Sequence, residues 1–95
     1  MYKLSVRAER DLALLYEYSA AQFGDAQAEA YLLDLEKTFC LLDEFPYMGR
    51  NVEHIRSSLR CHYHRSHSIY YKPIPKGIFI VRVLDQRMDQ YKQLQ

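Results

Sequence analysis

Apolar and polar residues follow two different periods in the first half of the chain. From Tyr2 to Val6 they alternate, which predicts a short strand. From Ala8 to Phe23 the apolar positions recur at steps of three and four residues, the spacing of one helical face. Gly24 ends this helix, and a second helix with the same spacing is predicted from Ala26 to Glu44. Because only about two residues join them, the two helices form an antiparallel hairpin.

The period returns to two in the second half of the chain, after a loop predicted from Pro46 to Glu53. Strands are predicted at Leu59–His64 and at His67–Lys72. The segment Gly77–Leu84 is almost continuously apolar, which is typical of a central strand buried on both faces. The sequence therefore predicts an α+β fold of order β-α-α-β-β-β, with the helical hairpin packed on a mostly antiparallel sheet.

One face of the predicted sheet has no helix to cover it, because the two helices suffice for a single face. We expect Phe79, Val81 and Val83 to pack against the helices. The residues then expected on the other face are Ile78, Ile80, Arg82 and Leu84, with Arg60, His62 and His64 from the neighbouring strands. An open apolar face on a small protein is typical of a binding surface. Either the C-terminal segment 87–95 or a segment of a partner covers it.

Arg82 is the one charged residue inside the apolar strand at the end of the chain. A buried guanidinium without a partner is very costly, so this side chain must reach a carboxylate, solvent or an anion. One interpretation is a structural ion pair with Asp85, with Asp89 or with an acidic residue on the helices. The other is that Arg82 presents its guanidinium to a ligand on the open face.

The size and composition of the chain fit a single globular domain spanning residues 1–95. It has 95 residues, of which 48% are hydrophobic and 26% charged. Two cysteines are too few for a disulfide scaffold, and no apolar run approaches the length of a membrane span. The N-terminal residues lack the apolar core of a signal peptide. We therefore expect a cytoplasmic protein with no membrane association.

Charge is divided unevenly along the chain. Residues 1–50 hold five Lys or Arg against nine Asp or Glu, and residues 51–95 hold eight against three together with all four histidines. The formal net charges of the two segments are therefore −4 and +5. An anionic partner would meet the second segment.

The histidines and cysteines were considered as metal ligands, but their spacing favours ordinary structural roles. His62 and His64 would project to the same face of a strand, with His67 across the turn. The sequence contains neither C-x-x-C nor H-E-x-x-H, so we expect no metal and no cofactor. Cys40 and Cys61 are predicted to be small core residues, and no motif supports nucleophilic catalysis.

Several segments, in their order and spacing, resemble one known family. They are the helical hairpin, Phe45-Pro46-x-Met48-Gly49-Arg50, Ile55-Arg56-x-x-Leu59-Arg60, His67-x-Ile69-Tyr70-Tyr71 and Val81-Arg82-Val83-Leu84-Asp85-Gln86-Arg87-Met88-Asp89. Together they resemble the ParE toxins of ParDE-type toxin–antitoxin modules, within the RelE/ParE superfamily. The closing motif departs from the family at one position, because Asp85 stands where a histidine is common.

The resemblance implies a toxin that inhibits DNA gyrase, blocks replication and is neutralised by a cognate antitoxin in a higher oligomer. Sequence-specific DNA binding is not expected. The residues that the resemblance suggests for the gyrase contact are Arg82, Arg87, Met88, Asp89 and Tyr91. The residues expected to contact the antitoxin on the open face are Ile78, Ile80, Arg82, Leu84, Arg60 and His62.

The same superfamily includes RelE-type ribonucleases, which cleave messenger RNA on the ribosome. Such cleavage requires cations for the phosphorane and groups that move protons. Arg60, Arg65 and Arg82 could supply the charge, and Tyr91, His62 or His64 could transfer protons. The second strand lacks lysines, however, and the C-terminal Arg-Met-Asp run is closer to ParE. We therefore expect an inhibitor of a topoisomerase rather than an enzyme, with ribonuclease activity as the alternative.

Overall fold

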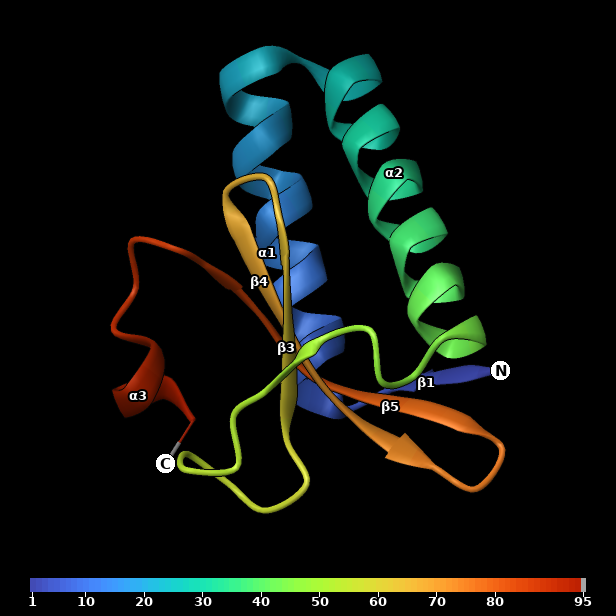
Figure 1. Ribbon diagram of the computed structural model, residues 1–95. Helices are drawn as coiled ribbons and strands as arrows, with labels where there is room; N and C mark the ends of the chain where they lie inside the picture. Colours follow the sequence, from blue (N-terminus) through green and yellow to red (C-terminus); the bar gives the residue numbers. More distant parts are fainter. Residues whose placement is uncertain (95) are drawn as a thin grey trace.

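Eight elements make up the computed structural model, which describes residues 1–94; Gln95, the end of the predicted C-terminal segment, lies outside the described residues. They are β1 (Tyr2–Leu4), α1 (Val6–Phe23), α2 (Asp25–Glu44), β2 (Arg50–Asn51), β3 (Arg60–His64), β4 (His67–Ile74), β5 (Gly77–Asp85) and α3 (Gln90–Gln93). The strands form one sheet in the order β1-β5-β4-β3-β2 (Figure 1). Only β1 and β5 pair in parallel, so the predicted mostly antiparallel sheet is confirmed.

The helical hairpin begins and ends close to the predicted residues. Ser5 caps α1, because its Oγ accepts a hydrogen bond from the Ala8 N–H at 2.9 Å. The same hydroxyl donates to the Val81 carbonyl at 2.7 Å and so ties the start of the helix to β5. Gly24 adopts φ +92°, a backbone conformation that favours glycine, and its N–H bonds the Ala20 carbonyl at the end of α1.

A first hydrophobic core lies between the helical hairpin and the sheet. Its buried members are Ala8, Leu15, Leu35, Phe39, Leu42, Ile69, Tyr71, Ile78, Ile80 and Val83. The expectation that Ile78 and Ile80 point away from the helices is therefore wrong. Both faces of β5 are apolar, so the alternation of its side chains alone does not say which face meets the helices.

A β-bulge in β5 explains why Val83 nevertheless faces the helices as predicted. Tyr70 pairs with Arg82 and Tyr71 with Ile80, which leaves Val81 as the extra residue. The bulge shifts the alternation by one position. Ile80 and Val83 therefore reach the same core although they are three residues apart.

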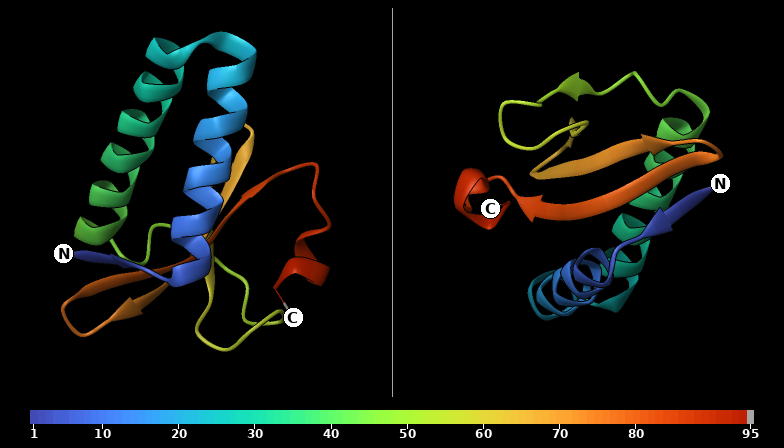
Figure 2. Two further views of the ribbon diagram at one scale, coloured as in Figure 1. Left: turned by 180° about the vertical axis from the view of Figure 1, so that it is seen from behind. Right: turned by 90° about the horizontal axis from the view of Figure 1, so that it is seen from below.

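A second hydrophobic core covers the face of the sheet that was predicted to be open. Its buried members are Val52, Leu59, Cys61, Tyr70, Val81, Leu84 and Leu94, with Ile55 and Phe79 packed against them. The chain following β2 and Leu94, after α3, supply the cover, and Figure 2 shows β4 and β5 between the segment following β2 and the helices. The expectation of an unoccupied sheet face is wrong, because this chain fills that face itself.

The two cysteines differ in their environment. Cys61 is buried in the second core, as predicted, and burial raises the pKa of its thiol. Cys40 is exposed on α2, so its predicted place in the core is wrong. No helix within residues 1–94 is long and apolar enough to cross a membrane.

Tyr71 fixes the loop between α2 and β2 from inside the first core. Its hydroxyl donates to the Pro46 carbonyl and accepts from the Gly49 N–H, both at 2.8 Å. A Cβ on Gly49 would lie 2.7 Å from Cε1 of the Tyr71 ring. We expect Gly49→Ala to lower the free energy of unfolding in urea by about 1–3 kcal/mol, because a buried side chain must move. Ser57→Ala, at an exposed loop position, is the control; equal stability of the two variants would contradict this packing.

Candidate functional site: a groove beneath the helical hairpin

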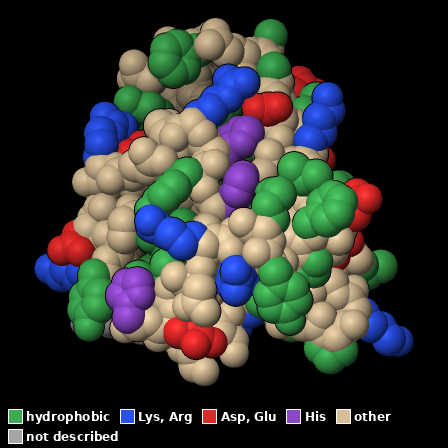
Figure 3. All heavy atoms as spheres, viewed as in Figure 1, with side chains coloured by type: hydrophobic (Ala, Val, Ile, Leu, Met, Phe, Trp, Pro, Cys, Tyr) green, Lys and Arg blue, Asp and Glu red, His purple; other side chains and the backbone are tan. Residues whose placement is uncertain are grey.

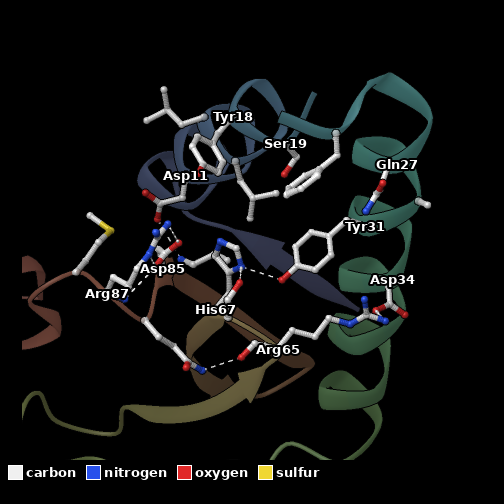
Figure 4. A pocket seen from close by; sticks show the side chains of 18 residues that line it. Asp11, Tyr18, Ser19, Gln27, Tyr31, Asp34, Arg65, His67, Asp85 and Arg87 are labelled. Atoms are coloured by element: carbon white, nitrogen blue, oxygen red, sulfur yellow. Dashed lines mark hydrogen bonds and ion pairs between the residues drawn. The ribbon is translucent and has the colours of Figure 1, made fainter. Parts of the chain in front are cut away.

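A groove of about 1150 Å³ lies between the helical hairpin and the adjacent ends of β4 and β5 (Figure 4). The wall that α1 contributes is predominantly apolar. Leu14, Tyr18 and Phe23 line it and remain 58%, 55% and 61% exposed. Large apolar side chains with this exposure lose contact with water when a partner binds, which favours association.

The groove exists because the hairpin is longer than the sheet beneath it. At 1.5 Å per residue, the 20 residues of α2 extend about 30 Å. Figure 1 shows that the connected ends of α1 and α2 extend beyond the turn between β3 and β4. Phe23, predicted on the buried face of α1, lies in this overhanging part and is exposed.

A tyrosine–histidine pair lies inside the groove. The hydroxyl of Tyr31, on α2, lies 2.8 Å from Nδ1 of His67, on β4. Burial lowers the pKa of His67 and raises the pKa of Tyr31, so both groups are neutral near pH 7. A neutral imidazole has one acceptor nitrogen, and we assign that role to Nδ1 with the phenol as donor.

Two ion pairs flank this tyrosine–histidine pair (Figure 4). Asp34 forms an ion pair with Nη2 of Arg65 at 3.3 Å, and Asp85 accepts a hydrogen bond from Nε of Arg87 at 3.1 Å. The hydrogen bond from the Arg87 side chain holds the pKa of Asp85 below its usual value. Because each guanidinium has a carboxylate partner, the groove does not concentrate cationic charge for a small anion. Apolar walls and paired charges suit an amphipathic peptide better.

Arg82 is engaged inside the molecule. Its Nε and Nη2 donate to the two carboxylate oxygens of Asp11 at 2.7 and 2.9 Å, and Asp11 also accepts from the Val83 N–H at 3.0 Å. Nη1 donates to the Gln93 carbonyl at 3.1 Å. The two paired side chains are only 8% and 11% exposed. The structural interpretation of Arg82, an ion pair with an acidic residue on a helix, is therefore the correct one.

Most residues predicted for the antitoxin contact are buried inside the protein. Ile78 and Ile80 are fully buried, Leu84 is 1% exposed and Arg82 is 7% exposed. Arg60 and His62 are half-buried on β3. The sheet face on which this contact was expected is therefore not available to a partner in this conformation.

Comparison with known proteins identifies the family. A family model described as the ParE toxin of the type II toxin–antitoxin system, parDE, matches residues 2–90. This chain belongs to the ParE toxin family. The resemblance of the motifs to ParE toxins is thereby confirmed.

Individual ParE relatives match almost the whole chain. A protein named Toxin ParE1 from Caulobacter vibrioides is 35% identical over 88 residues, covering 93% of this chain and 91% of that protein. Toxin ParE1 from Mycobacterium tuberculosis is 34% identical over 94 residues, covering 98% and 96%. A solved structure, the chromosomal ParDE TA system from P. aeruginosa, superposes with a TM-score of 0.75 at 20% identity, covering 88% of this chain and 92% of that one. That structural match supports the ParE fold.

The last part of the closing motif, residues 86–89, lies in an exposed segment between β5 and α3. Arg87, Met88, Asp89 and Tyr91 are all exposed, with Met88 and Tyr91 at 40% and 55%. Asp89 also caps α3, because its carboxylate accepts from the Lys92 N–H at 3.1 Å. Arg87 and Met88 in addition line the groove.

The residues considered for ribonuclease chemistry are engaged at separate places. Arg60 donates to the carbonyls of Gly49 and Tyr47, Arg65 pairs with Asp34 and Arg82 is buried beside Asp11. Three cations that must converge on one phosphate are thus held at three separate places. Among residues 1–94, no group of three or more His, Cys, Asp or Glu side chains is arranged to hold a metal ion.

Sequence reasoning missed most of the groove. Leu14 and Tyr18 lie one helical turn apart but outside the predicted apolar face of α1, and this second apolar stripe was the available signal. Tyr31, on the second helix, is half-buried at the groove. The contact between Tyr31 and His67 joins residues 36 apart, which no local pattern reveals.

Proposed function

We propose that this ParE toxin inhibits DNA gyrase and that a cognate antitoxin neutralises it by placing an amphipathic segment in the groove. The observation that carries the proposal is the apolar wall of Leu14, Tyr18 and Phe23, exposed above paired charges. A segment that folds on binding loses conformational entropy, and apolar burial must offset that loss. The far face of the sheet is filled by the second core.

The proposed gyrase contact consists of Arg87 and Met88, exposed members of the closing motif, and of the exposed Tyr91 on α3. Asp89 supports this contact by capping α3. Arg82 supports it from inside the molecule by holding the Gln93 carbonyl. Because Arg87 and Met88 also line the groove, an antitoxin segment bound there would cover part of the gyrase contact. Neutralisation would then follow from direct competition between the antitoxin and gyrase for these residues. We propose that the toxin–antitoxin complex is a higher oligomer.

The direct test of this function is a supercoiling assay with purified toxin and gyrase. We expect inhibition at a near-stoichiometric ratio, and release of inhibition when the cognate antitoxin is added. Messenger RNA on translating ribosomes should remain intact in a parallel reaction. Cleaved messenger together with unaffected supercoiling would replace the proposal with the ribonuclease alternative.

Variants of the closing motif locate the gyrase contact. We expect Arg87→Ala and Tyr91→Ala each to raise the toxin concentration for half-maximal gyrase inhibition about tenfold or more, as for truncation of an interface anchor. Lys92→Ala removes a neighbouring exposed side chain and should leave inhibition unchanged. The melting temperature controls for folding. Unchanged inhibition by both motif variants would place the contact elsewhere.

A further inference from the structure

Two arginine–tyrosine pairs lie side by side on the β2–β3 edge of the sheet, away from the groove. The Arg50 guanidinium lies 5.1 Å from the ring centre of Tyr63, and that of Arg60 lies 5.3 Å from the ring centre of Tyr47. We refer to these four residues as the arginine–tyrosine edge. None of them lines the groove or belongs to α3. Figure 3 shows one face of the molecule, on which Lys or Arg side chains and hydrophobic side chains lie near two central histidines.

The two arginines of this edge differ from three arginines that follow them in the chain, each of which is paired with a carboxylate. Arg65, Arg82 and Arg87 each form an ion pair with an aspartate. Arg50 and Arg60 form no such pair within residues 1–94. The chain from residue 45 to residue 65 holds four arginines and a single acidic residue, Glu53. Local charge is therefore left unneutralised at this edge.

The structure holds these side chains in place before any ligand binds. Arg60 donates to the Gly49 carbonyl at 2.9 Å and to the Tyr47 carbonyl at 3.1 Å, and Arg50 donates to the Tyr63 hydroxyl. The tyrosine side chains remain open, since Tyr47 is 72% and Tyr63 is 51% exposed. A ligand therefore meets oriented cations beside accessible aromatic rings, with little side-chain entropy left to lose.

We propose that the arginine–tyrosine edge binds a single DNA strand without sequence preference. Arg50 and Arg60 contact phosphates, and bases stack on Tyr47 and Tyr63. Nucleic-acid surfaces of this kind combine backbone cations with aromatic stacking platforms, whereas an acidic peptide would use the cations alone. The choice of DNA rests on the proposed function, because a gyrase inhibitor acts where a DNA segment is bound.

The test measures fluorescence anisotropy of a labelled 20-nucleotide oligo(dT) titrated with the full-length toxin between 50 and 200 mM KCl. Two phosphate contacts predict that log K falls with log[salt] at a slope of about −1.4, with weaker binding to a duplex of equal length. The double variant Arg50→Gln/Arg60→Gln should lose most of this slope. The matched control Arg7→Gln/Arg10→Gln removes two exposed arginines of α1 and should leave binding unchanged.

Two single variants separate the edge from a loss of folding. Tyr63→Leu keeps an exposed apolar side chain but removes the ring, and we expect about tenfold weaker binding of oligo(dT). Arg50→Gln changes an exposed side chain and should reduce the salt slope by about 0.7 at an unchanged melting temperature.

Several outcomes would overturn the proposal. Equal affinity for a polyglutamate peptide would identify an acidic protein as the ligand, and tighter binding of oligo(rU) would identify RNA. Absence of binding at 50 mM KCl, or equal loss in the Arg7/Arg10 control, would exclude the edge. The assay contains no gyrase, so its failure is distinguishable from failure of the proposed function, which the supercoiling assay decides.

Discussion

Asp11→Ala is expected to lower the free energy of unfolding by about 3–5 kcal/mol. The substitution leaves the guanidinium of Arg82 buried without its bidentate carboxylate, and an uncompensated buried charge is strongly destabilising. It also removes the acceptor of the Val83 N–H at the end of β5. Urea denaturation followed by circular dichroism measures the loss.

The double variant Asp11→Leu/Arg82→Met separates two contributions to the free energy of unfolding. One is the destabilisation by an unpaired buried charge, and the other is the net stabilisation by the intact ion pair. Apolar replacement of both partners of a buried ion pair is often neutral or stabilising, so most of the loss should be recovered. If Asp11→Ala costs less than about 1 kcal/mol, Arg82 reaches solvent. Its assignment as a structural residue would then be withdrawn.

Tyr18→Asp is expected to weaken antitoxin binding by about 30-fold or more. Tyr18 lines the groove and is half-exposed, so its ring is available to an inserted segment. Loss of a central aromatic anchor costs about 2 kcal/mol or more, and the introduced carboxylate adds a desolvation cost. Isothermal titration of the purified toxin with its antitoxin measures the change, and gyrase inhibition by the free toxin should persist.

Leu33→Asp is the matched control for this prediction. Leu33 lies on α2, is 54% exposed and does not line the groove. The two variants therefore introduce the same charge at apolar helix positions of similar exposure. Equal weakening by both would show that charge on the hairpin, rather than contact in the groove, controls antitoxin binding.

The fold was predictable because its local signals are strong. The hairpin is predicted by apolar spacing of three and four residues, by Gly24 between the helices and by Pro46 after them. In the structure both helices begin and end within two residues of their predicted bounds. The continuous apolar run of β5 correctly indicated a strand buried on both faces. Such patterns depend on neighbours along the chain, which a single sequence contains.

The cover of the far sheet face was not predicted because its components are short and distant. Val52, Ile55 and Leu59 are apolar residues in a loop with no regular period, and Leu94 stands alone at the end of α3. Each is unremarkable by itself, and they form a core only when the sheet brings them together. An apolar sheet face without a covering helix can therefore be covered by apolar loop residues of the same chain.

The residues of the site were predictable to different degrees. The exposed closing motif around Arg87 and Met88 stands out in sequence, since it follows the buried strand with polar and flexible residues. The partner of Arg82 was not identifiable, because Asp11 lies 71 residues away on the first helix. The groove depends on the overhang of the hairpin beyond the sheet, a length relation that sequence periods do not contain.

Hydrogen exchange of the toxin with and without its antitoxin tests most directly whether the partner occupies the groove. We expect slower amide exchange on antitoxin binding in residues 14–23 of α1 and in residues 85–88, at the end of β5 and directly after it. Residues 52–59, which already cover the far sheet face, should exchange at an unchanged rate. Slower exchange confined to residues 52–64, with α1 unaffected, would contradict the groove as the antitoxin site.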